Sequence, residues 1–141
     1  MRTKLALVLA GIGLACSVPV AAHHAVGGEY DANKPVTVTG TVTKIDWVNP
    51  HARIYFDVVG PDGTVTTWSV ELAARVVLER MGWNGRSLKV GQKVTVKGDG
   101  ARSGAPMLNA RAREQRALEG GGTPAEYPIT LEDGTPVLND R

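Results

Sequence analysis

The chain has 141 residues, which is room for one domain and little else. It carries 16 Lys and Arg against 14 Asp and Glu, a formal net charge of +2 at pH 7. So small an excess of positive charge lacks the basic footprint of a nucleic-acid-binding domain, and we expect no nucleic-acid partner.

Residues 1–22 have the organisation of a secretory signal peptide. Arg2 and Lys4 give a positive start, an uncharged apolar run follows over residues 5–15, and Val20-Ala21-Ala22 provides the small residues of a cleavage site. The apolar run is too short to cross a bilayer, so we expect no membrane span. Cleavage removes two basic and no acidic residues and leaves 14 of each sign. This predicts a neutral mature protein that is periplasmic or secreted.

The single cysteine, Cys16, lies inside the predicted signal peptide, so a mature chain without it contains no disulfide. Gly13-Leu14-Ala15-Cys16 also resembles a lipoprotein box, with the leucine one position out of place. A lipid anchor at Cys16 is therefore the alternative to a released protein.

A long, bent first strand is predicted after residue 36. Val36, Val38 and Val42 alternate with threonines, which is the period of a strand, and the apolar phase then changes before Trp47. A change of phase within one strand requires a bulge or a sharp bend, and Gly40 is the residue that permits close bending. A bent strand of this kind serves both halves of a closed barrel.

Four further strands and one helix follow. Alternating residues predict strands over 52–58 and 64–72, joined by a turn at Gly60-Pro61-Asp62-Gly63. Helical spacing then begins at Ala73 and ends at Gly82. Two more strands are predicted, one ending near Gly98 and the other over 107–113. The order of three strands, a helix and two strands is that of an OB-type barrel, a mainly β, five-stranded Greek-key fold.

The predicted domain therefore covers residues 36–115. An N-terminal segment over 23–35 precedes it, and a loosely attached tail over 116–141 follows it, with a hairpin pattern around Asp133-Gly134. The predicted core consists of Val38, Val42, Ile54, Phe56, Trp68, Val70, Val77, Val94, Val96 and Leu108.

The three histidines lie beside the predicted cleavage site or in the first interstrand loop, on the rim where OB folds bind ligands. After cleavage behind Ala22, His23 offers both its α-amino group and its imidazole to a metal ion. After cleavage one residue earlier, His24 becomes the third residue and completes a similar nitrogen-rich chelate. Such sites favour Cu(II) or Ni(II). We therefore predict copper as the ligand, with His23, His24 and His51 as the metal-binding residues.

Each of these residues also has a simpler interpretation. Paired histidines can be solvated residues, and Asn49-Pro50-His51 can be an ordinary turn. Trp47 is a candidate to stack on a ligand beside Asn49, or else a core residue. No catalytic residue is predicted: the mature chain has no cysteine and no glycine-flanked serine, and its carboxylates have the pattern of solvated strand or loop residues. These carboxylates are Glu29, Asp31, Asp46, Asp57 and Glu71.

Several short motifs in a fixed order resemble those of a bacterial family of small exported domains of unknown function. The motifs are His23-His24, the run from Glu29 to Val36, Gly40-Thr41-Val42 and the run from Trp47 to Ala52. Members usually carry serine and phenylalanine after the paired histidines, where this chain has Ala25-Val26. The resemblance implies export and no established activity.

Together these patterns predict an exported, non-enzymatic binding module with copper as the first ligand to test. One alternative is a structural or adaptor subunit whose rim and exposed strand edges bind another exported protein. Another is a binder of a small organic or carbohydrate ligand, since the fold serves many functions.

Overall fold

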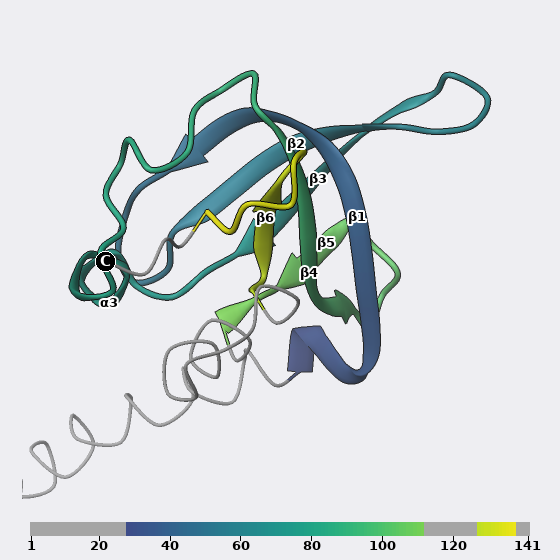
Figure 1. Cartoon of the computed structure of the whole chain (residues 1–141). Helices are drawn as coiled ribbons and strands as arrows, with labels where there is room; N and C mark the ends of the chain where they lie inside the picture. Colours follow the sequence, from purple (N-terminus) through teal and green to yellow (C-terminus); the bar gives the residue numbers. More distant parts are fainter. Residues whose placement is uncertain (1–27, 112–126, 138–141) are drawn as a thin grey trace, which may run out of the picture.

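Five strands close into a barrel in the computed structural model, which describes residues 28–111 and 127–137 (Figure 1). The elements are β1 (Tyr30–Asp46), β2 (Arg53–Val59), β3 (Val65–Glu71), α3 (Arg75–Arg80), β4 (Lys93–Ala101), β5 (Met107–Asn109) and β6 (Ile129–Leu131). The strands pair in the order β1-β2-β3-β5-β4, and β4 pairs back with β1. Only the β3–β5 pair in this ring is parallel. This confirms the predicted mainly β, OB-like barrel with one short helix between the third and fourth strands.

β1 is long because it serves two sides of the barrel. Its first half pairs with β4 and its second half pairs with β2, and the register with β2 shifts between Val42 and Lys44. Gly40 lies where the backbones of β1 and β2 approach most closely. A Cβ atom at Gly40 would lie 2.5 Å from the carbonyl oxygen of Asp57, so only glycine fits. The predicted bent first strand is therefore present, with its irregularity just after Gly40.

The barrel begins earlier in the chain than the sequence predicts. Tyr30 pairs with Ala101 at the end of β4, so it belongs to β1 rather than to a separate segment over residues 23–35. The remainder of that segment includes His23 and His24, which lie outside the described residues.

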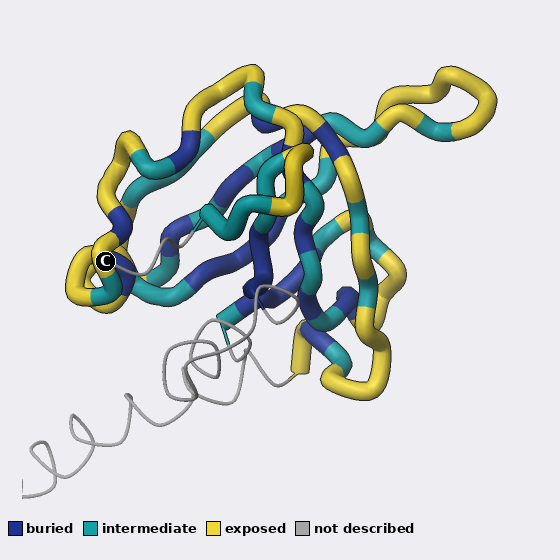
Figure 2. Tube along the Cα trace, viewed as in Figure 1, coloured by how far each residue is buried: buried dark blue, intermediate teal, exposed yellow. Residues whose placement is uncertain are grey.

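Figure 2 shows that the buried residues line the inside of the barrel. Two of the predicted core residues, Val38 and Trp68, are only partly buried and pack against this core. The prediction of Val77 is wrong: its side chain is 41% exposed, whereas Leu78 is fully buried. α3 has only six residues and begins at Arg75, so its single buried position falls one residue later. The predicted core residues that are fully buried are Val42, Ile54, Phe56, Val70, Val94, Val96 and Leu108.

The C-terminal region packs more closely than the predicted loose tail over residues 116–141. β6 pairs with β4, and Ile129 joins the core together with Tyr127. The chain then turns at Gly134, whose φ of 83° requires glycine, and the amide of Leu131 donates to the carbonyl of Thr135 at 2.8 Å. Residues 127–137 are therefore a hairpin that extends the barrel sheet beyond β4.

No helix within residues 28–111 and 127–137 has the length and apolar character needed to cross a membrane.

Candidate binding site around Glu71

The register of the β2–β3 hairpin separates an inner from an outer face. Ile54 pairs with Val70 and points into the core, whereas the next pair, Arg53 with Glu71, lies on the outer side of the barrel. On the far side of β3, Glu71 pairs with Asn109 of β5. Three adjacent strands therefore bring Arg53, Glu71 and Asn109 side by side at one end of the outer face.

Glu71 is the centre of this cluster. Its side chain is only 6% exposed, and its Oε2 atom lies 2.8 Å from Nη2 of Arg53. Its Oε1 atom lies 2.9 Å from Nδ1 of His51, which the loop after β1 delivers to the same place. A buried carboxylate is stable only when it is paired, and here Arg53 donates to Oε2, whereas Oε1 lies close to the His51 ring without a hydrogen-bond partner among the described residues. The expectation that Glu71 is a solvated residue is therefore wrong, because strands on both sides enclose it.

His51 presents its second ring nitrogen away from this pair. Burial, and then the positive charge of Arg111, lower the pKa of His51 below its ordinary value, although the negative charge of Glu71 opposes them. The imidazole is therefore neutral at pH 7. A carboxylate only accepts hydrogen bonds, so the closeness of Nδ1 to Oε1 favours the tautomer that protonates Nδ1 and leaves a lone pair on Nε2, although the two atoms are not hydrogen-bonded. The His51 side chain is 27% exposed, so this lone pair can meet a ligand.

Tyr30 closes the cluster from the start of β1. Burial, and then the negative charge of Glu71, raise the pKa of Tyr30 to about 12. The hydroxyl is therefore neutral at any physiological pH, and it is available as a hydrogen-bond donor beside the carboxylate.

Trp47 lies in the same loop as His51 but packs in another direction. Its ring stacks on Trp83 with centroids 6.4 Å apart and an interplanar angle of 7°. Its Nε1–H donates to Oε1 of Glu79 on α3 at 3.4 Å. One ring face of Trp47 is therefore used in packing against the helix side of the barrel. Asn49 is exposed in the intervening bend, and the peptide bond between Asn49 and Pro50 is cis.

Of the predicted site residues, only His51 joins the cluster around Glu71. His23 and His24 lie outside the described residues, so their relation to His51 stays a prediction. Within the described ranges, no three His, Cys, Asp or Glu side chains are grouped as a metal site. Arg53, Glu71 and Tyr30 belong to the cluster although sequence patterns did not predict them as site residues. The tight turn at residues 60–63 was the available signal for Arg53 and Glu71, because it fixes the register that places them opposite each other.

Comparison with known proteins gives one family match. A model described as "Family of unknown function (DUF6152)" matches residues 12–108, which is more than half of the chain. No curated protein matches.

Solved structures similar to this chain share its type of fold at low identity. The N-terminal domain of PriB protein from Thermoanaerobacter tencongensis is 21% identical, with a TM-score of 0.37, over 48% of this chain and 74% of that one. The mitochondrial single-stranded DNA binding protein Rim1 from S. cerevisiae is 10% identical, with a TM-score of 0.38, over 54% and 86%. A small single-stranded DNA-binding protein from Streptomyces coelicolor is 18% identical, with a TM-score of 0.30, over 46% and 72%.

These structures correct the expectation that nucleic acid is excluded as a partner. Two of the similar chains are named for binding single-stranded DNA. The exclusion rested on net charge, which averages over the whole surface, whereas binding of a single strand depends on the charges and aromatic rings of one groove.

Proposed function

The chain belongs to the Family of unknown function (DUF6152), and from that premise we propose that it is an exported, non-enzymatic binding module whose site is the rim around His51. Copper is the first ligand, with His23 and His24 as the principal chelating residues and His51 as an additional ligand. Trp47 and Asn49 border the same rim.

The contact between His51 and Glu71 carries this proposal. Histidines that bind metals almost always donate their other ring N–H to a carboxylate, a carbonyl or water, which fixes the ring and its tautomer. Oε1 of Glu71 lies 2.9 Å from Nδ1 of His51 without a hydrogen bond between them, and Arg53 holds the carboxylate through Oε2, so a candidate partner of this kind stands beside the ring. This closeness supports His51 as an additional ligand through Nε2.

The charges around His51 explain why it would add to a chelate rather than form one. The positive charge of Arg111 disfavours protonation of His51, and for the same reason it disfavours binding of a metal cation there. At a processed N-terminus, the amine and the imidazole lose their protons near neutral pH and together chelate Cu(II). The strong site is therefore expected at His23 and His24.

The same contacts support a binding role over a catalytic one. Arg53 engages Oε2 of Glu71, and the carboxylate is buried. It is thus unavailable as an acid or base for a substrate, because such a group must come within hydrogen-bond reach of the reacting proton.

The test is calorimetric titration of Cu(II) into protein purified from the exporting cell. An intact mass is measured first, and it should correspond to a chain beginning at His23. A mass corresponding to a lipid-modified Cys16 would contradict a released protein.

The matched control carries three additional alanines ahead of His23, so that neither His23 nor His24 is among the first three residues. We expect this variant to bind Cu(II) at least tenfold more weakly than the native chain, with its barrel unchanged. A His51→Gln variant should lose less Cu(II) affinity than the extended chain does. Equal affinity of the native and extended chains would contradict the N-terminal chelate. Absence of binding to both would remove copper as the ligand.

A further inference from the structure

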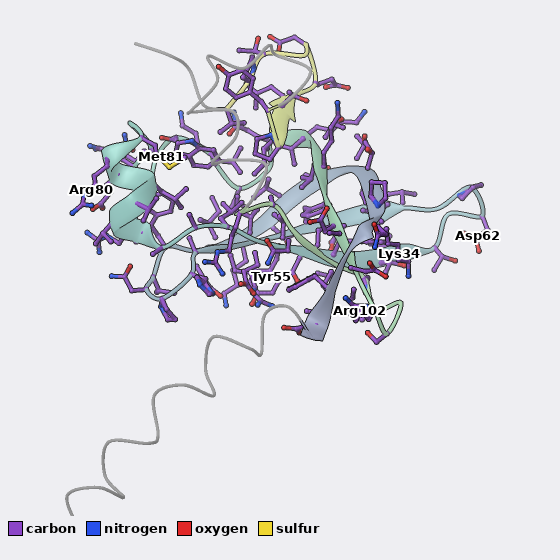
Figure 3. The ribbon with its side chains drawn as sticks, turned by 90° about the horizontal axis from the view of Figure 1, so that it is seen from below. Lys34, Tyr55, Asp62, Arg80, Met81 and Arg102 are labelled. Carbon is purple, nitrogen blue, oxygen red and sulfur yellow. The ribbon has the colours of Figure 1, made fainter. Side chains whose placement is uncertain are left out.

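The β2–β3 hairpin projects beyond the barrel as an arm, which we define as residues 58–67. Figure 3 shows Asp62 at the tip of this arm, at the opposite end of the molecule from Arg80 of α3. β1 pairs with β2 only as far as Asp57, and β5 pairs with β3 only from Ser69 onward. Within the described part of the chain, therefore, no strand pairs with the β3 edge of the arm.

Two backbone hydrogen bonds show which backbone groups face this open edge. The carbonyl of Thr64 accepts from the amide of Gly60 at 2.8 Å, so Thr64 faces β2. The amide of Ser69 donates to the carbonyl of Pro106 at 3.1 Å, so Ser69 faces the other side. Because backbone groups alternate along a strand, Val65 and Thr67 direct their N–H and C=O groups to the open edge. The edge thus offers both donors and acceptors.

The side chains along this edge do not protect it. From Thr64 to Val70 there is no charged residue and no proline, the two means by which exposed edges usually avoid pairing. Val65 is 57% exposed and Val59, its cross-strand partner, is 68% exposed. Both lie on the outer face of the arm and present an apolar pair to solvent.

We propose that the β3 edge of the arm is an interface between two copies of this chain, paired antiparallel about a two-fold axis. Val65 then lies opposite Thr67 of the partner subunit, and each such pair exchanges two backbone hydrogen bonds. The edge is complementary to itself because donors meet acceptors and no like charges are brought together. The two exposed valine pairs become neighbours on one continuous sheet.

The second copy is favoured over a different partner by this self-complementarity. A symmetric dimer uses the same patch on both subunits, so a patch without net charge meets no repulsion from its own copy. This interface lies at the opposite end of the hairpin from His51 and Glu71, so it goes beyond the proposed ligand-binding function.

Sedimentation velocity over a range of concentrations tests this interface on the processed full chain. We expect the sedimentation coefficient to rise with concentration toward that of a dimer. Val65→Lys places a charge on the edge and should raise the dissociation constant at least tenfold. Val90→Lys is the matched control, since Val90 is 65% exposed but lies outside the arm, and it should dimerise like the native chain.

Hydrogen exchange supplies a second measurement that does not depend on the variant. The amides of Val65 and Thr67 should be protected at high protein concentration and exposed at low concentration. A protein that stays monomeric at every concentration would overturn the proposal, and so would equal dimerisation of the Val65→Lys chain. Cu(II) titration of Val65→Lys should be unchanged, so failure of the dimer is distinguishable from failure of the metal site.

Discussion

The two ends of the β2–β3 hairpin follow the same alternating pattern but have opposite environments. At the barrel end, Phe56 is fully buried inside and the outer residue Glu71 is only 5% exposed. At the arm end, Val59 is 68% exposed although its side chain is apolar. The two strands are continuous, so the difference comes from their neighbours. β1 covers one flank and β5 the other at the barrel end, and neither reaches the arm.

This comparison shows that the position of a strand residue relative to neighbouring strands can outweigh its hydrophobicity. A charged residue is enclosed because three strands, a histidine and an arginine surround it, while a valine six residues further along the hairpin is left in water. Buried charges need pairing, and Glu71 has it from Arg53. An exposed apolar edge instead invites a partner.

The largest difference between the two ends should appear on truncation of Phe56. Phe56→Ala removes an aromatic ring from the centre of the core and should lower the free energy of unfolding by about 3–5 kcal/mol. Val59→Ala at the arm should change it by less than about 0.5 kcal/mol, as expected at a surface position. Urea denaturation of both variants measures the contrast. A cost under about 1 kcal/mol for Phe56→Ala would mean that the faces of β2 are assigned the wrong way round.

A smaller effect is expected from Glu71→Gln, which keeps the size of the side chain but removes its charge. Arg53 would lose a charged acceptor in a mostly buried place, so the free energy of unfolding should fall by about 1–3 kcal/mol.

Glu79→Gln on α3 is the matched control, because Glu79 pairs with Arg75 on an exposed surface. Exposed pairs of this spacing contribute at most about 0.5 kcal/mol. Equal losses from Glu71→Gln and Glu79→Gln would show that the cluster around Glu71 has no special role in stability.

Much of the barrel could be predicted because its causes are local. Alternating residues fixed the inner face of the hairpin, and glycine at position 40 marked the close approach of β1 to β2. The order of strands and helix then left few ways to close a sheet. The buried positions of Phe56 and Val70 followed from the same alternation.

The incorrect predictions concern features that local sequence patterns do not specify. The choice between Val77 and Leu78 depends on where a six-residue helix begins, which helical spacing alone does not fix. Enclosure of Glu71 requires Tyr30 and Asn109, which lie far from it in the chain. Packing of β6 against β4 joins residues separated by a glycine-rich stretch, so local patterns gave no sign of it.

The smallest predicted effect is the titration of His51, which reports the charges at the barrel end directly. Its pKa should lie below the ordinary value of about 6.5 because burial and Arg111 disfavour the charged ring. NMR titration of the imidazole should show Arg111→Gln raising this pKa and Glu71→Gln lowering it, since one change removes an opposing charge and the other a supporting one. Failure of the two variants to shift the pKa in opposite directions would contradict the arrangement of these charges around His51.

The lowered pKa also fixes how stability depends on pH. Because the unfolded chain binds the His51 proton more readily than the folded chain does, the free energy of unfolding should decline as pH falls below about 6.5, until the folded pKa is passed. Replacing His51 with Gln removes this titration, so its stability should depend less on pH in that window. Val65→Lys at the arm leaves His51 untouched and should keep the native dependence. A pH profile altered equally by both variants would mean that the two ends of the hairpin are not independent.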